Sequence, residues 1–211
     1  MTHIKFDNVQ DTRRLYRKLL DCMARPGKVQ DVSEQLQMIP TDLPCSQGIF
    51  AIAQTLLDQQ VGFYLSSDEA HQREAVRYLE WTTGSRFKGI AEADYLFFER
   101  QSPAQQIRSA LSEARIGSFL EPEKSTTLIF IIRGVSSSEK YPLHLTLSGP
   151  GICQSRELFI DGLAAEWLRQ RAARNREYPQ GYDWILLSED GEMTAIPRTT
   201  AIESEVLSWD M

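Results

Sequence analysis

The sequence predicts an α/β protein in which helices cover both faces of one mixed sheet, a three-layer α/β/α sandwich. Helical and strand-like patterns alternate in the first half of the chain, which is typical of parallel strands with crossover helices. The run Thr126–Ile132 is rich in strand-forming residues and does not alternate, as expected of a strand buried on both faces. Strands joined by short turns dominate after it. The 211 residues contain no repeat or linker, so residues 1–211 are expected to form a single domain.

The first element is predicted to be an amphipathic helix over residues 9–24. Apolar side chains recur on one side at helical spacing: Leu15, Tyr16, Leu19, Leu20 and Met23. A basic cluster lies on the other side: Arg13, Arg14, Arg17 and Lys18. Asp7 or Asn8 can cap the helix, and Pro26–Gly27 ends it. We expect a basic outer surface on this helix.

The following elements alternate in type. Residues 28–45 contain two prolines and are expected to be irregular. The patterns then predict helices over 47–58, 68–82 and 102–114, with strands over 61–65 and 95–99 between them. Ser46 is expected to cap the first of these helices, and Ser102, followed by Pro103, the last.

The second half is predicted to be richer in strands. Residues 141–148 alternate apolar and polar side chains, and 156–160 form another short strand. A helix is expected from Asp161 or Gly162 to Arg176. Strands over 182–187 and 192–196 flank a turn sequence and predict a β-hairpin, with a last short strand after Thr200. Residues 133–141 are expected to be a hairpin loop.

Composition excludes several classes of protein. The formal net charge is -6, so a nucleic-acid-binding role is not expected. No apolar run approaches the roughly 20 residues of a membrane span, and no secretory signal pattern occurs at the start. Three widely separated cysteines, Cys22, Cys45 and Cys153, indicate neither a disulfide framework nor a metal site. We therefore expect a protein of the reducing cytoplasm.

No constellation of catalytic residues is visible in the sequence. The histidines are isolated from one another, and no metalloprotease, nucleophile-elbow or phosphate-loop motif occurs. Gly149-Pro150-Gly151 resembles the start of a dinucleotide fingerprint, but Gln154 replaces its last glycine, so a tight turn is favoured. Ser85-Arg86-Phe87-Lys88 matches a Ser-x-x-Lys spacing without the partner motifs and is read as a loop.

Two arginines beside prolines are the main candidates for an anion site or an interface. Arg25 precedes Pro26, and Arg198 follows Pro197 and precedes the hydroxyls of Thr199 and Thr200. The alternative is that each arginine stabilises its own turn. Four further arginines crowd the end of one predicted helix, where they favour either a solvated, dipole-compensating face or an interface: Arg169, Arg171, Arg174 and Arg176.

Four segments, in order, carry a family resemblance across nearly the whole chain. They are TRRLYRKLLDCMARPG at 12–27, LSGPGI at 147–152, YPQGYDWILL at 178–187 and AIPRTT at 195–200. Together they resemble the PhnH family, the H subunit of the bacterial carbon–phosphorus lyase core complex. Tyr16 stands where Phe is expected and Tyr182 where a small aliphatic residue is expected, and both keep apolar bulk. Residues 28–145 carry no such segment.

The resemblance implies a fold similar to the large domain of pyridoxal-phosphate-dependent transferases, without the pyridoxal phosphate. It also implies a homodimer that joins the G, I and J subunits of the complex. MgATP is then a substrate of the complex, and this chain binds no cofactor or metal. The family has no assigned catalytic residues to place on this sequence.

The expected function is that of an accessory subunit. The complex transfers an alkylphosphonate onto the ribose C1 of MgATP with release of adenine, giving a ribose 1-phosphonate 5-triphosphate. The alternative is direct binding of phosphonate or triphosphate through Arg25, Arg198, Thr199 and Thr200. A third hypothesis, a pyridoxal-phosphate enzyme acting through Lys88, is the least favoured.

Overall fold

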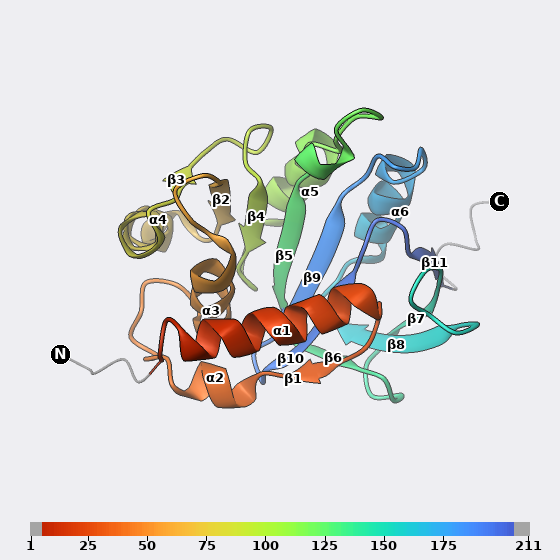
Figure 1. Cartoon of the computed structure of the whole chain (residues 1–211), viewed down its shortest axis with the longest axis horizontal. Helices are drawn as coiled ribbons and strands as arrows, with labels where there is room; N and C mark the ends of the chain where they lie inside the picture. Colours follow the sequence, from red (N-terminus) through yellow and green to blue (C-terminus); the bar gives the residue numbers. More distant parts are fainter. Residues whose placement is uncertain (1–5, 205–211) are drawn as a thin grey trace.

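A seven-stranded mixed sheet forms the centre of the computed structural model, which describes residues 6–204 (Figure 1). Its strand order is β1-β10-β9-β5-β4-β2-β3. The strands are β1 (Gln30–Asp31), β2 (Gly62–Ser66), β3 (Arg86–Phe87), β4 (Tyr95–Phe98), β5 (Thr127–Ile132), β9 (Asp183–Ser188) and β10 (Glu192–Ile196). The strands from β9 to β3 are parallel, and β10 and β1 are antiparallel to their neighbours. The predicted α/β class and mixed sheet are therefore confirmed.

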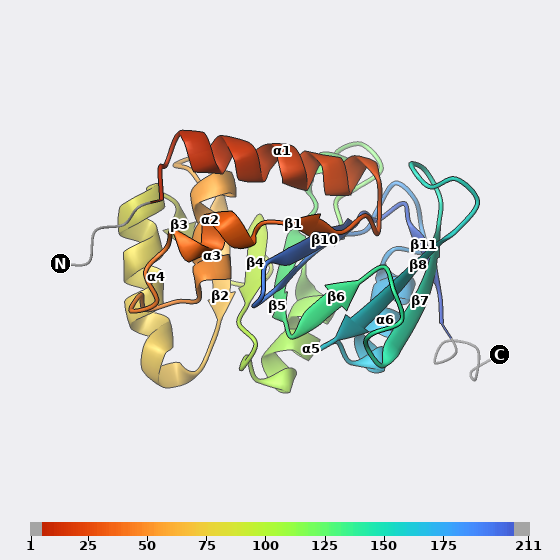
Figure 2. The ribbon, with the colours of Figure 1, turned by 90° about the horizontal axis from the view of Figure 1, so that it is seen from below.

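Helices cover both faces of this sheet, as Figure 2 shows. The helices α1 (Gln10–Ala24), α2 (Ser33–Gln37), α3 (Gln47–Leu56) and α4 (Glu69–Thr83) share one apolar cluster with the sheet. The helices α5 (Ala104–Glu113) and α6 (Ala165–Arg174) share the other. The expected likeness to pyridoxal-phosphate-dependent transferases stays a prediction.

The central strands supply side chains to both clusters. In β5, Ile129 packs with the first cluster, whereas Leu128 and Phe130 pack with the second. Neighbouring β4 divides in the same way, because Phe97 belongs to the first cluster and Phe98 to the second. Burial on both faces explains why these strands read as continuous apolar runs rather than as alternating ones.

A second sheet, which the sequence did not predict, stands beside the first. It is antiparallel, with the order β11-β7-β8-β6: β11 (Ala201–Glu203), β7 (Leu143–Ser148), β8 (Arg156–Asp161) and β6 (Gly134–Ser136). The interpretation of residues 133–141 as a hairpin loop is wrong in part, because β6 pairs with β8. Buried and half-exposed residues alternate along β7 and β8, so only one face of this sheet meets the core.

Two of the predicted helix caps are confirmed. The Asp7 carboxylate accepts hydrogen bonds from the amides of Val9 at 2.8 Å and Gln10 at 2.7 Å, before α1. The Ser46 hydroxyl accepts one from the Ile49 amide at 3.3 Å and caps α3. The cap at Ser102 is wrong, since its hydroxyl donates to the Ser66 carbonyl at 2.6 Å instead. That bond joins the start of α5 to the end of β2.

Other boundaries differ from the sequence prediction. Residues 28–45, expected to be irregular, contain β1 and α2, and the expected loop at 85–88 contains the edge strand β3. Helix α6 begins at Ala165 instead of 161 or 162, because β8 continues to Asp161 and Gly162 turns the chain with a φ of +106°. A short 3-10 turn, η1 (Pro122–Lys124), follows α5.

The predicted turns are present. Strands β9 and β10 form the expected hairpin, with Met193 opposite Leu187. Gly149-Pro150-Gly151 lies between β7 and β8 and not before a helix, which confirms the interpretation as a strand-to-strand turn. Among the described residues, no helix is long and apolar enough to cross a membrane.

Candidate functional site

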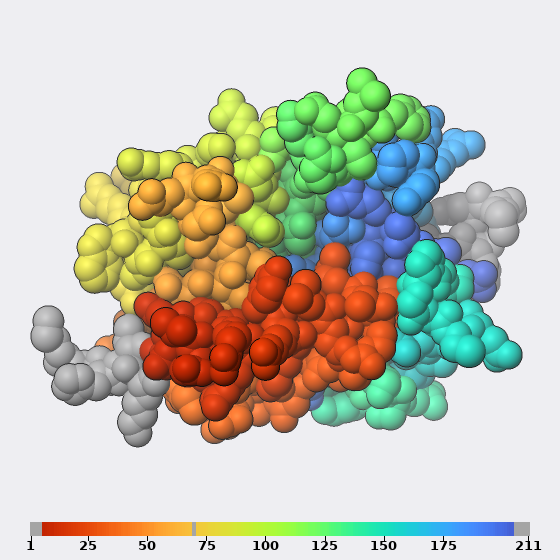
Figure 3. All heavy atoms as spheres, viewed as in Figure 1, coloured from red at the N-terminus to blue at the C-terminus, as the bar shows by residue number. Residues whose placement is uncertain are grey.

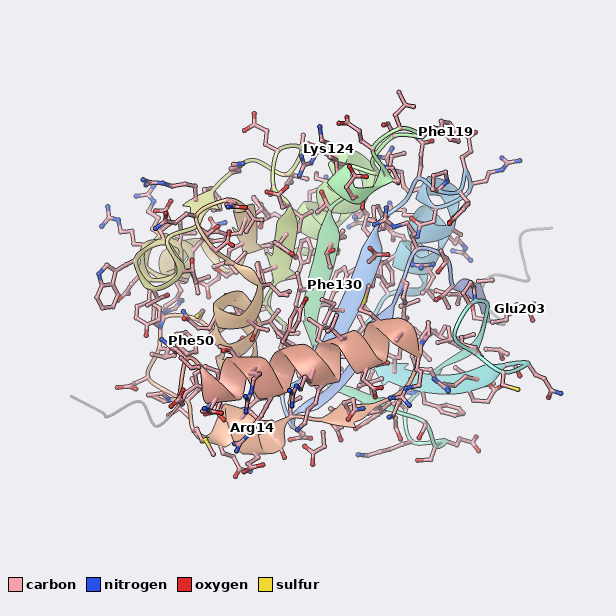
Figure 4. The ribbon with its side chains drawn as sticks, in the orientation of Figure 1. Arg14, Phe50, Phe119, Lys124, Phe130 and Glu203 are labelled. Carbon is pink, nitrogen blue, oxygen red and sulfur yellow. The ribbon has the colours of Figure 1, made fainter. Side chains whose placement is uncertain are left out.

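A cavity of about 520 Å³ lies where α6 meets the segment between β10 and β11. The AIPRTT motif supplies one wall through Arg198, Thr199 and Thr200. The remaining lining residues come from α6 and the residues after it, from the turn after β7 and from β11: Leu168, Arg171, Ala172, Asn175, Tyr178, Pro150, Ala201 and Ile202. The structure thus brings together three of the four residues that the sequence singled out. Figure 4 labels Glu203, at the end of β11 next to this segment.

Arg198 is held by a carboxylate. Its Nη2 donates to Asp183 Oδ2 at 2.8 Å and its Nε to Oδ1 at 3.3 Å, and its Nη1 donates to the Pro122 carbonyl at 2.7 Å. The backbone amide of Arg198 also donates to Asp183 Oδ1 at 2.7 Å. This two-point pair is neutral overall and joins the start of β9 to the end of β10.

Arg25 lies elsewhere. It is the residue after the last turn of α1, and its guanidinium pairs with Asp21 on the same helix. Its carbonyl accepts a hydrogen bond from Arg156 Nη1 at 3.0 Å. Arg25 does not line the cavity, so the structure does not join it to Arg198, Thr199 and Thr200.

Arg171 lies inside the protein, where the sequence interpretation did not place it. It was expected on a solvated or docking face of its helix, but it is buried, with 3% exposure. Its guanidinium lies 5.6 Å from the Trp184 ring and donates to the carbonyls of Pro197 at 2.6 Å and Thr200 at 3.3 Å. Burial lowers the pKa of Arg171 to about 10, so it stays protonated at neutral pH.

Two polar atoms of this wall have no partner within the described residues. They are Nε of Arg171 and Oγ1 of Thr200, and both are buried. The sequence held a signal for the inward position of Arg171. Residues three and four apart share a helix face, and Arg171 lies three residues after Leu168 and four before Asn175. Leu168 is buried, and Arg171, three residues later, is buried on the same side of the helix.

A second region, beside the ends of β2 and β4, holds groups that could in principle react. Cys45, His71 and Glu99 line a cavity of about 370 Å³ there. His71 Nδ1 lies 2.8 Å from Asp68 Oδ1. Burial raises the pKa of the Cys45 thiol to about 12, so the thiol is protonated and a poor nucleophile at neutral pH. No group of three or more His, Cys, Asp or Glu among the described side chains could hold a metal ion.

Lys88 follows the edge strand β3. Its amide donates to the Phe63 carbonyl at 2.8 Å, and its side chain packs against Gly62. It does not line either of these two cavities. Arg171 and Thr200 offer cationic and hydroxyl donors beside apolar side chains, an arrangement suited to binding rather than to proton transfer.

Comparisons with known proteins point to one family. The family model described as "Bacterial phosphonate metabolism protein (PhnH)" matches residues 5–203. The chain is 26% identical over 200 residues to the alpha-D-ribose 1-methylphosphonate 5-triphosphate synthase subunit PhnH of Rhizobium meliloti (strain 1021), covering 94% of both chains. It is also 27% identical over 192 residues to HtxG of Stutzerimonas stutzeri, named as a C-P lyase subunit protein, covering 89% of this chain and 83% of HtxG.

Proposed function

Because the chain belongs to the PhnH family of bacterial phosphonate metabolism proteins, we propose that it is an accessory, non-catalytic subunit of the carbon–phosphorus lyase core complex. The observation that carries the proposal is the alignment, over 94% of both chains, with a relative named as a subunit of a synthase. The proposed reaction of the complex is transfer of an alkylphosphonate onto the ribose C1 of MgATP, with release of adenine. The proposed partners are a second copy of this chain and the G, I and J subunits, in the cytoplasm.

The solvent side of α1 supports a docking role. We call Arg13, Tyr16, Arg17 and Leu20 the α1 outer face. Tyr16 is 47% exposed and Leu20 is 49% exposed, although both are large and apolar. Figure 3 shows α1, in red, lying uncovered across this face of the molecule, and Figure 4 shows Arg14 on the same helix. Tyrosine and arginine are enriched at protein interfaces, so a partner surface would cover this face favourably.

The charge of the α1 outer face favours a different subunit over a second copy. A two-fold contact between two copies of α1 would bring arginines of one chain against arginines of the other. Within the described part of the chain Arg17 forms no ion pair, so its charge is available to an acidic partner surface. We therefore assign the α1 outer face to the contact with another subunit and leave the homodimer to another surface.

The alternative of direct phosphonate or triphosphate contact by Arg25, Arg198, Thr199 and Thr200 has weaker support. Both arginines already pair with carboxylates, Arg25 with Asp21 and Arg198 with Asp183. Recruiting Arg198 for a ligand would break its largely buried pair with Asp183, at a cost of about 3 kcal/mol. Arg25 is more exposed, but it does not line the cavity. The geometry thus supports the accessory role better.

The test is reconstitution of the complex with and without this chain. Adenine release from MgATP and methylphosphonate is measured, together with the mass of the assembly by light scattering after size-exclusion chromatography. We expect a dimer of this chain alone, a larger assembly with the other subunits, and little turnover without this chain. Full turnover by the other subunits alone would overturn the proposal.

Charge-reversal variants locate the contact. Arg17→Glu is expected to weaken assembly at least about tenfold, and turnover should fall in proportion to the complex lost. Arg77→Glu on α4 is the matched control, because Arg77 is also an exposed arginine in the middle of a helix. Equal effects of the two reversals would contradict the assignment of the α1 outer face. Loss of turnover in a fully assembled Arg17→Glu complex would contradict the accessory role.

A further inference from the structure

We propose that the cavity between α6 and the β10–β11 segment binds a small organic anion, a carboxylate or phosphonate with an apolar body, through Arg171 and Thr200. This proposal does not rest on the accessory role, because it concerns the isolated chain. It also differs from the alternative considered above, since the cation is Arg171 and not Arg25 or Arg198.

The charge of Arg171 has no counter-ion among the described residues. Within the described part of the chain, its guanidinium donates to the carbonyls of Ile196, Pro197 and Thr200, and no carboxylate forms an ion pair with it. The nearby Asp183 is committed to the two-point pair with Arg198. A buried charge compensated only by neutral dipoles is costly, and an anion in the cavity would remove that cost.

Two residues that line the cavity each carry a buried polar atom without a partner among the described residues. Arg171 Nε and Thr200 Oγ1 are buried without partners in the described structure, and both residues line the cavity. The two residues are neighbours, because Arg171 Nη1 donates to the Thr200 carbonyl at 3.3 Å. A planar guanidinium edge beside a hydroxyl matches the oxygens of a carboxylate or phosphonate.

The rest of the cavity selects for an apolar body. Its volume of about 520 Å³ is typical of sites for small molecules and exceeds what a bare inorganic ion would fill. Leu168, Ala172 and Ile202 contribute apolar walls, and the exposed Tyr178 stands among the lining residues. A ligand with both an anionic head and a hydrocarbon or aromatic part would satisfy both portions of the cavity.

Calorimetric titration of the full-length chain tests the proposal. The probes are phenylphosphonate, benzoate, inorganic phosphate and the neutral benzyl alcohol, at constant ionic strength. We expect at least one organic anion to bind about tenfold or more tightly than inorganic phosphate, and benzyl alcohol not to bind. The phosphonate and carboxylate arms decide which head group is preferred. Failure of both organic anions to bind at millimolar concentration would overturn the proposal.

Variants separate binding from folding. Thr200→Val removes the unpartnered hydroxyl and keeps the side-chain volume, so we expect about tenfold weaker binding without loss of thermal stability. Arg171→Met is expected to abolish binding. If the Met variant does not fold, Arg171→Lys is measured in its place, because it retains the charge. Arg176→Met, an exposed arginine close along the chain, is the control and should bind within about twofold of wild type. Equal binding by Thr200→Val and wild type would contradict the site.

The outcomes are independent of those for the accessory role. Anion binding by a chain that never enters a larger assembly would support the site and overturn the accessory role. Assembly of a chain that does not bind the anions would support the accessory role and overturn the site.

Discussion

The Asp183 carboxylate joins the first residue of β9 to Arg198, the second residue after β10, through two side-chain hydrogen bonds at 2.8 and 3.3 Å. The two side chains are 12% and 16% exposed, so the pair is largely removed from water. Arg198 also donates to the carbonyl of Pro122, the first residue of η1. One ion pair therefore fixes the segment that forms a wall of the cavity to two other parts of the chain.

Asp183→Asn is expected to lower the free energy of unfolding by about 3 kcal/mol, because it leaves the Arg198 charge buried without a counter-ion. Urea denaturation measures the change. The control is Glu166→Gln, since Glu166 and its partner Arg108 are both 45% exposed. Loss of this exposed ion pair should cost less than about 1 kcal/mol. Similar losses of unfolding free energy in the two variants would show that the Asp183–Arg198 pair stabilises the fold no more than an exposed ion pair does.

Gly191→Ala is expected to destabilise the protein by at least about 2 kcal/mol. Gly191 adopts a φ of +96°, and an added Cβ would lie 2.6 Å from both the amide nitrogen and the Cα of Ser33. Because those atoms are backbone, α2 or the β9–β10 hairpin would have to move. Thermal unfolding measures the change. Gly89→Ala, where an added Cβ meets nothing within 4 Å, should be close to neutral in the same measurement. Comparable melting temperatures for the two variants would contradict this interpretation.

Local patterns predicted most of the central fold. The amphipathic helix α1, the cap at Ser46 and the β9–β10 hairpin depend on residues close in sequence, and all are present. The apolar side of α1 is narrower than predicted, because Tyr16 and Leu20 are about half exposed. The second sheet depends on pairings between distant residues, such as Gly134 with Asp161. An alternating strand indicates that one face is exposed, but it does not indicate which strand lies beside it.

The candidate site was predictable only in part. The AIPRTT motif led to a segment that lines the cavity through three of its residues, and their role in binding stays a prediction. The role of Arg171 depends on its contacts with Trp184 and with Pro197, which lie on other elements. Four arginines near one helix end resemble a solvated face, so composition concealed the one that is buried. Helical spacing relative to Leu168 was the better guide.

The three cysteines are expected to differ strongly in reactivity. Burial raises the pKa of both Cys22 and Cys45 to about 12, whereas Cys153 is exposed. The thiolate is the reactive form, so iodoacetamide at pH about 8 should alkylate Cys153 at least about a hundredfold faster than the other two. Peptide mapping by mass spectrometry reports each rate, and labelling in urea confirms that all three react when unfolded. Fast alkylation of native Cys45 would contradict the raised pKa and would show that this thiol is reactive in the cavity that it lines.

Glu99 is expected to make stability depend on pH. Burial raises its pKa above the ordinary value of 4.5, even though the Ser46 amide donates to its carboxylate at 2.8 Å, and the nearby Glu189 raises it further. The folded state therefore holds this proton more tightly than the unfolded state, so stability falls as pH rises from the ordinary pKa through the raised one.

Glu99→Gln keeps a carbonyl acceptor for Ser46 without the charge. Its advantage over wild type in urea denaturation should be absent below the ordinary pKa and grow toward neutral pH. Glu74→Gln, at an exposed position on α4, is the control and should show no such trend. An advantage for Glu99→Gln that is the same at acidic and neutral pH would contradict a raised pKa, because it would mean that folding does not shift the pKa of Glu99.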